Sequence, residues 1–199
     1  MYNYLDFYKT ISIEDLDKYA QYAGFSSDYP IDLKNFKKIF GNRKKILEVG
    51  CGTGRIGKHL ISESFDYTGI DTNQEYLDHF NKSLDKSLSY HVENINFLEM
   101  PEKQFDIILF PWSVIGDFSK YEQEAVLNKS IKMLSDKGII LLDNPTKETI
   151  HNSAQGYEPT KFYFDDWKDF FAKLDLKKFY KITYATNTDR TREITVLEK

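Results

Sequence analysis

Apolar and polar positions alternate in blocks along the chain, and the blocks have the lengths of strands and helices. Short runs of mainly apolar residues predict strands over 44–50, 65–71, 88–94, 104–112 and 137–144. Apolar residues that recur at helical spacing predict helices over 55–63, 73–84 and 121–134. Strands that alternate with helices in this way indicate a mainly parallel sheet that is covered on both faces.

The two ends of the chain do not follow this alternation. Before the first strand, amphipathic patterns predict helices over 12–22 and 31–40. Ser12 and Asp32 are their expected N-caps, and Gly24 and Gly41 their expected stops. The C-terminal part predicts a helix and then two alternating strands, over 165–176, 177–187 and 191–199.

We expect the two C-terminal strands to form a hairpin that closes one edge of the sheet, antiparallel to the rest. The fold class predicted is therefore α/β. It is a doubly wound, mostly parallel seven-stranded sheet with a C-terminal antiparallel hairpin and two N-terminal helices.

Composition narrows the choice of partners. The 199 residues suit one domain with a full core, and the formal net charge of −4 argues against a nucleic-acid partner. The one cysteine, Cys51, allows no intramolecular disulfide and no thiolate metal cluster, so no metal is expected. With no apolar run near the ~20 residues of a membrane span and no signal peptide, we expect a cytoplasmic protein without a membrane partner. The oligomeric state stays open.

The loop after the first strand carries four glycines in eight residues, Gly50 to Gly57 in "GCGTGRIG". Its part "GTGRIG" matches the G-x-G-x-x-G fingerprint of dinucleotide-binding proteins. Glu48, two residues before the first glycine, argues against that ligand because a carboxylate repels pyrophosphate and attracts a cation. Asp71 ends the second strand, 21 residues after Gly50, where a carboxylate can bind both ribose hydroxyls. The alternative for Asp71 is a helix N-cap.

These segments resemble the successive motifs of class I S-adenosylmethionine-dependent methyltransferases, namely "ILEVGCGTGRIG", "YTGID", "FDIILFPWSVI" and "LSDKGIILLDN". The resemblance covers residues 44–144 and implies the Rossmann-like fold of that family, with S-adenosyl-L-methionine as cofactor. It implies one methyltransferase domain over 1–199, made of an N-terminal helical lid segment (1–43) and a Rossmann-like core (44–199).

The resemblance also assigns cofactor contacts. Glu48 and the glycine backbone would hold the methionine part, Asp71 the ribose, and Asn94 with Ile95 the adenine, although the family often has Asp where this chain has Asn94. The cofactor-binding residues expected are Glu48, Gly50, Cys51, Gly52, Thr53, Gly54, Asp71, Thr72, Asn94, Ile95 and Phe110.

The acceptor should lie beside "FPWSVIGDF", residues 110–118, which follows the fourth strand. Trp112 and Asp117 are candidate catalytic residues there; alternatively Trp112 is core and Asp117 caps the next helix. His151, in the long connection 144–164, is the histidine placed to act as a base. The substrate pocket is expected to include Tyr22, Tyr29, Pro111, Ser113 and Asn144.

The acceptor class is narrowed by what the chain lacks. It has "FPWS" where methyltransferases of exocyclic amines carry [DN]-P-P-[YFW], and no Pro-Cys pair of the cytosine-C5 type. A small-molecule acceptor is therefore the leading hypothesis, while the methylated atom stays open. The alternatives are a protein or peptide methyltransferase, a non-catalytic cofactor-binding regulatory module, and a nicotinamide-dependent oxidoreductase.

Overall fold

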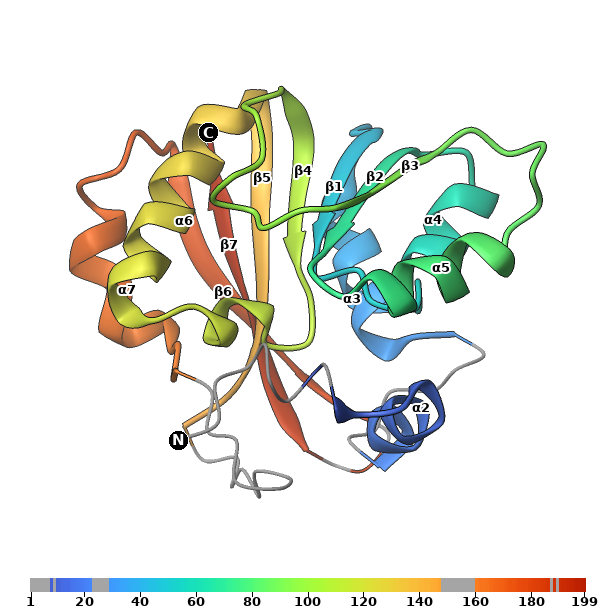
Figure 1. Cartoon of the computed structure of the whole chain (residues 1–199). Coiled ribbons are helices and arrows are strands. Elements are labelled where there is room, and N and C mark those ends of the chain that lie inside the picture. Colours follow the sequence, from blue (N-terminus) through green and yellow to red (C-terminus); the bar gives the residue numbers. More distant parts are fainter. Residues whose placement is uncertain (1–7, 9, 23–28, 148–159, 187, 189) are drawn as a thin grey trace.

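The sheet has seven strands in the order β3-β2-β1-β4-β5-β7-β6, seen edge-on in the computed structural model in Figure 1. The structure describes residues 8, 10–22, 29–147, 160–186, 188 and 190–199. The strands are β1 (Lys45–Val49), β2 (Asp66–Asp71), β3 (His91–Asn94), β4 (Phe105–Phe110), β5 (Leu134–Pro145), β6 (Lys178–Ala185) and β7 (Thr191–Glu198). Neighbouring strands from β3 to β5 pair parallel, which confirms the doubly wound core.

The C-terminal hairpin joins the sheet through its second strand. β7 lies between β5 and β6 and is antiparallel to both. β6 therefore runs in the same direction as β5, and β7 opposes both, which confirms the predicted C-terminal antiparallel hairpin at one edge of the sheet. The long register of β7 on β5, from Glu198 opposite Ile139 to Arg192 opposite Pro145, brings the start of β7 beside the carboxyl end of β5.

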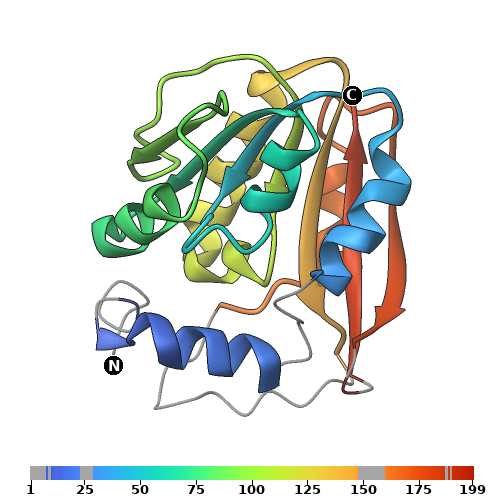
Figure 2. The same cartoon turned by 90° about the vertical axis from the view of Figure 1, so that its right-hand side faces the viewer.

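Helices cover both faces of the sheet, as its apolar strands require. They are α2 (Ile13–Tyr22), α3 (Ile31–Phe40), α4 (Gly57–Ser62), α5 (Gln74–Lys82), α6 (Lys120–Met133) and α7 (Phe164–Phe171), with a 3₁₀ turn η1 (Val114–Asp117). Side chains of α6 and α7 join one core cluster, and those of α3, α4 and α5 join the other. Figures 1 and 2 show α2 apart from both layers, across the end of the sheet where β4 finishes.

The helix caps agree with the sequence in part. Ser12 accepts the Asp15 backbone N–H at 3.1 Å, and Gly41 ends α3 with φ 58°, as expected. Gly24 lies outside the described residues. Asp32 is not a cap: Pro30 precedes α3 without a side-chain cap, and Asp32 is instead buried in an ion pair. The Asp32 carboxylate lies in the first turn of α3, where its Oδ1 accepts the Leu33 N–H at 3.0 Å, and it pairs with Arg55, a partner that no local pattern indicates.

Two further caps remove alternatives left open by the sequence. Asn73, not Asp71, caps α5 by accepting the backbone N–H groups of Glu75 and Tyr76. Ser119 caps α6 in a reciprocal capping box with Glu122, so Asp117 is not needed there. Both aspartates are thereby left for other roles at the carboxyl ends of β2 and β4.

Candidate cofactor and acceptor site

A cavity lies at the carboxyl ends of β1, β2 and β4, and α2 forms part of its wall through Leu16, Asp17 and Ala20. This is the edge at which parallel α/β sheets collect ligands. Many of the residues expected from the sequence line it, namely Glu48, Gly50, Cys51, Gly52, Thr53, Asp71, Thr72, Ile95, Pro111, Trp112 and Asp117. Segments more than 60 residues apart in sequence therefore converge on one enclosed space.

The glycines of the loop serve different purposes. Gly50, Gly52 and Gly54 all have positive φ, at 69°, 52° and 81°. A Cβ at Gly54 would overlap the Phe80 ring, whereas a Cβ at Gly52 would meet nothing within 4 Å. Gly54 is therefore required by packing, and Gly52 is the place where a ligand can approach the backbone. A Cβ at Gly57 would overlap Tyr67 and Phe80, so the fourth glycine is explained by helix packing.

Asp71 ties the end of β2 to the glycine loop. Its Oδ2 accepts the Gly52 N–H at 2.8 Å, and its Oδ1 accepts the Asn73 N–H at 2.9 Å. Burial raises the pKa of the Asp71 carboxyl, and the backbone hydrogen bonds work against that rise. The carboxylate is held in one orientation on the cavity wall.

Glu48 is buried on the same wall, where its Oε2 accepts the Tyr67 hydroxyl at 2.6 Å. Burial raises the pKa of Glu48 to about 8, against the lowering effects of Tyr67 and Arg55. Without a cation beside it, Glu48 is therefore mostly protonated at neutral pH. From the sequence, Glu48 was expected to be ionised at all times. Its burial instead keeps the carboxyl group protonated until a cation binds beside it.

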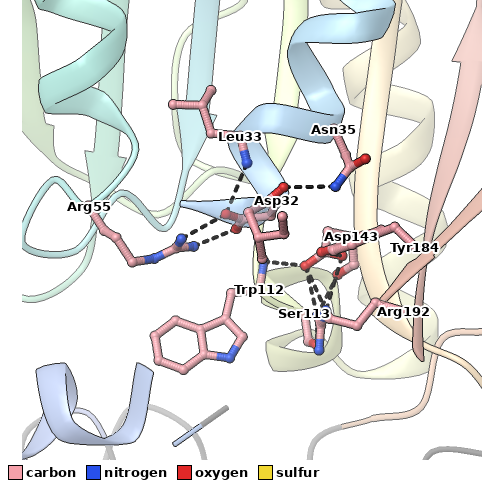
Figure 3. A network of polar contacts seen from close by, with 10 residues as sticks. Asp32, Leu33, Asn35, Arg55, Trp112, Ser113, Asp143, Tyr184 and Arg192 are labelled. Atoms are coloured by element: carbon pink, nitrogen blue, oxygen red, sulfur yellow. Dashed lines mark hydrogen bonds and ion pairs between the residues drawn. The ribbon is translucent and has the colours of Figure 1, made fainter. Parts of the chain in front are cut away.

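Trp112 joins three segments at the other end of the cavity. Its indole stacks on Tyr19 of α2 with ring centroids 5.6 Å apart, and the Arg55 guanidinium lies 5.5 Å from its ring centroid. Arg55 itself forms a bidentate pair with Asp32, at 2.8 and 2.6 Å. Figure 3 shows this arrangement, with Trp112 projecting toward α2. Trp112 is thus a wall residue with its own partners, rather than part of the main core.

Six of the residues expected at the site do not line the cavity: Gly54, Asn94, Phe110, Ser113, Asn144 and Tyr29. Phe110 faces the core because side chains alternate along β4, and it packs on Phe97 at 5.5 Å. Ser113 is turned toward Arg192, and Asn144 is buried in β5. Tyr29 is 40% exposed and packs against His59.

Asn94, the residue expected to contact the adenine, does not line the cavity. Asn94 is exposed at the end of β3, while Asn96 lines the cavity together with Ile95 and Phe97. The offset counted from the fourth strand pointed to the last residue of β3, but the chain turns into the cavity only after that strand ends. His151 and the side chain of Tyr22 lie outside the described residues.

Several lining residues were not expected from the sequence. Tyr8, Leu16, Asp17 and Ala20 come from the N-terminal segment, and Arg55 from the glycine loop itself. The apolar stripe of α2 was visible in the sequence, since Leu16 and Ala20 stand four apart on one face. A lid over residues 1–43 was expected from the resemblance, but the sequence did not indicate which side chains of α2 face the cavity.

Comparisons with known proteins agree with this geometry. A family model described as a methyltransferase domain matches residues 46–138. A ubiquinone biosynthesis O-methyltransferase of Rickettsia bellii is 32% identical over 122 residues, which cover 57% of this chain and 45% of that protein. The chain thus spans about half the length of that curated relative.

Two solved structures share the fold. An S-adenosylmethionine-dependent methyltransferase from Clostridium acetobutylicum superposes with a TM-score of 0.71 at 12% identity, covering 93% of this chain and 97% of that one. The magnesium protoporphyrin IX methyltransferase of Synechocystis, with S-adenosylmethionine bound, gives 0.66 at 11% identity, covering 96% and 86%. The chain therefore resembles the class I S-adenosylmethionine-dependent methyltransferases, and its residues 46–138 match their methyltransferase domain. S-adenosylmethionine is the cofactor of those proteins, and the cavity of this chain fits it.

The fit rests on charge and on space. The acidic residues that line the cavity are Asp17, Glu48, Asp71 and Asp117, and the one described basic residue, Arg55, is already paired with Asp32. Such a wall suits a cationic cofactor and opposes the pyrophosphate of a dinucleotide. The open backbone at Gly52 gives the cofactor room against the loop. Among the described residues, no three His, Cys, Asp or Glu side chains are grouped to hold a metal ion. Within the same residues, no helix has the length and apolar character to cross a membrane.

Proposed function

We propose that this chain transfers a methyl group from S-adenosylmethionine to a small-molecule acceptor. The observation that carries the proposal is that one cavity is lined both by Glu48, Gly52 and Asp71 and by Trp112 and Asp117. When bound, the cofactor supplies an electrophilic methyl group on its sulfonium. The residues of the chain then have to bind, orient and desolvate the two reactants.

Cofactor binding is assigned to residues at three strand ends. Asp71 would bind the ribose hydroxyls, because its carboxylate is oriented by Gly52 and Asn73. Glu48 and the open backbone at Gly52 would hold the methionine part. Ile95 and Asn96 would border the adenine, where an apolar side chain can pack on the ring and an amide can hydrogen-bond its edge.

The acceptor would lie at the end lined by Pro111, Trp112 and Asp117. Asp117 is the described residue there that can accept a proton from the acceptor. His151 was predicted from the sequence to act as a base, and it stays a proposal for the same role. Which atom of the acceptor is methylated decides whether a base is needed at all, because only a nucleophile that begins protonated requires one.

A small acceptor is favoured because the N-terminal lid segment covers the cavity. Tyr8 and three residues of α2 line it, and α5 holds that segment through Asn73 and Tyr76, which donate to the carbonyls of Tyr8 and Ile11. A protein acceptor would have to bring its side chain under this cover. The Rickettsia relative, by its name, acts in ubiquinone biosynthesis, which also supports a small molecule.

The cofactor is tested by calorimetry with S-adenosylhomocysteine and with NAD. We expect S-adenosylhomocysteine to bind and NAD not to bind; the reverse result would overturn the proposal. Asp71→Ala should weaken S-adenosylhomocysteine at least about tenfold, because a charged hydrogen-bonding partner is lost. Asp66→Ala is the matched control, since Asp66 is exposed at the start of the same strand.

The reaction is tested with S-adenosylmethionine labelled in its methyl group. The protein is offered fractionated small molecules and, separately, peptide pools. Label transferred to small molecules supports the proposal, and label transferred only to peptides replaces it with the peptide alternative. Tight cofactor binding with no label in either pool would favour a non-catalytic module.

A further inference from the structure

The loop that carries Trp112 has an unusual backbone. Trp112 and Ser113 are consecutive residues with positive φ, 46° and 65°. Residues with a Cβ seldom adopt the left-handed conformation, and two in a row persist only where the surroundings hold them. Neither residue is glycine, although glycine would make this turn less costly. Something outside the loop must therefore hold it.

A buried ion pair on the neighbouring strands holds it. The Trp112 N–H donates to Asp143 Oδ2 at 3.1 Å, and the Ser113 N–H donates to the Asp143 backbone carbonyl at 2.8 Å. Arg192 donates from Nη2 to Ser113 Oγ at 2.9 Å and to Asp143 Oδ2 at 2.8 Å. Tyr184 donates its hydroxyl to Asp143 Oδ1 at 2.7 Å. Figure 3 shows these groups converging on the turn from the ends of β5 and β7.

Stability alone does not explain this ion pair. Asp143 is 0% exposed and Arg192 is 6% exposed. The desolvation of two such charges offsets most of their attraction, and apolar replacements of buried pairs are often as stable or more so. What the pair supplies and an apolar pair could not is directed side-chain hydrogen bonding to the strained turn, from Asp143 to the Trp112 N–H and from Arg192 to the Ser113 hydroxyl.

The turn decides where the indole of Trp112 lies. With this backbone, the ring reaches the cavity wall between Tyr19 of α2 and Arg55 of the glycine loop. We propose that Arg192, acting through Asp143 and Ser113, is a positioning residue that sets Trp112 in the wall of the acceptor end. The role rests on the proposed function, because this end of the cavity receives an acceptor only if methyl transfer takes place there.

Trp112 itself reports on the proposal. The chain has two tryptophans, and Trp167 does not line the cavity; it is buried and stacks on Phe162 in the α6–α7 core cluster. In a Trp167→Phe background, the tryptophan emission comes from Trp112 alone. Acrylamide quenching of that emission then measures how well the indole is held in the wall, without any need for turnover.

The test compares Arg192→Met with the background protein at a temperature where circular dichroism shows both folded. We expect the quenching constant of Trp112 to rise at least about twofold, because a turn without its partners relaxes. Adding Ser113→Gly to Arg192→Met should restore much of the protection, since glycine adopts positive φ readily. Arg192→Lys should be intermediate, because one ammonium cannot replace the guanidinium fork.

A purely structural role gives a different result. If Arg192 only stabilises the sheet, Arg192→Met lowers the melting temperature while the quenching of Trp112 in the folded protein stays unchanged, and that result overturns the proposal. Should Arg192→Met not fold, Ser113→Ala decides, because it breaks the contact to Arg192 and leaves the ion pair intact. Unchanged quenching in Ser113→Ala would then overturn the proposal. Binding of S-adenosylhomocysteine to the background protein, measured separately, tests the proposed function independently.

Discussion

Binding of S-adenosylhomocysteine should release a proton from Glu48, and replacing Glu48 with Gln should abolish this release. Burial raises the pKa of Glu48 to about 8, so about 90% of the free protein carries this proton at pH 7. The proposed site places the ammonium of the methionine part beside Glu48. An opposite charge at that range lowers the pKa of a carboxyl by about 1 to 3 units. Binding should therefore expel the proton.

The size of the effect follows from these two values. If the ammonium lowers the pKa of Glu48 from about 8 to about 6, binding at pH 7 releases about 0.8 proton. The same shift makes the affinity rise about sixfold from pH 6.5 to 7.5, because the α-amino group of the ligand stays protonated over that range. Glu48→Gln has no proton to release, and Gln can still accept the hydrogen bond from Tyr67.

Calorimetry in two buffers measures the proton directly. Titration with S-adenosylhomocysteine at pH 7 in phosphate and in Tris gives different heats if protons are released, because the two buffers take up protons with different enthalpies. We expect the difference in the wild type and little of it in Glu48→Gln. Equal proton release in the two proteins would refute the reasoning. So would an affinity of the wild type that does not change between pH 6.5 and 7.5.

Three further predictions concern stability. Gly52→Ala should cost about 1 kcal/mol and lower the melting temperature by about 2 to 4 °C, because only its positive φ is unfavourable. Gly54→Ala should cost several times more, since its Cβ would overlap a buried ring; equal losses would contradict the division of roles. Asp32→Asn leaves Arg55 with a neutral partner and should cost about 3 kcal/mol in urea unfolding. A loss under about 1 kcal/mol, as for exposed pairs, would contradict it. The pKa of Glu48 rises from 4.5 to about 8 on folding, so its contribution is present below pH 4.5 and is lost toward pH 8. The free protein should therefore lose roughly 3 to 4 kcal/mol between pH 5 and pH 8 relative to Glu48→Gln, as measured by urea unfolding at those two pH values.

The residues expected to bind the cofactor could be predicted from the sequence because most of them lie close together in it. Glu48, Gly50 and Gly52 lie within five residues, and Asp71 ends the next strand. Strand ends of a parallel sheet meet at one edge, so the order of the motifs already places these residues together. The hydrophobic pattern predicted β1, β4 and β5 because a buried parallel strand is mainly apolar along its length.

The charge states and the partners of the site residues could not be predicted from the sequence in the same way. The charge state of Glu48 depends on how completely it is buried and on Tyr67, which reaches it from β2. Asp32 resembled a helix cap because capping is the commonest local role of an aspartate near a helix start. Its actual partner, Arg55, is 23 residues away, and local pattern carries no information about pairs at that separation.

The proposed acceptor end is shaped by ion pairs between residues that lie far apart in the sequence. Asp32 with Arg55 lies on one side of Trp112, and Asp143 with Arg192, 49 residues apart, on the other. In sequence, Asp143 stands in an ordinary strand end, and Arg192 reads as an exposed residue of an edge hairpin. It is the insertion of β7 beside β5 that buries Arg192 and brings it to the turn. Motifs therefore predict the residues of the proposed cofactor site, whereas the topology of the last two strands shapes the wall that an acceptor would meet. Changes in β7 could for that reason alter the acceptor end while leaving the glycine loop intact.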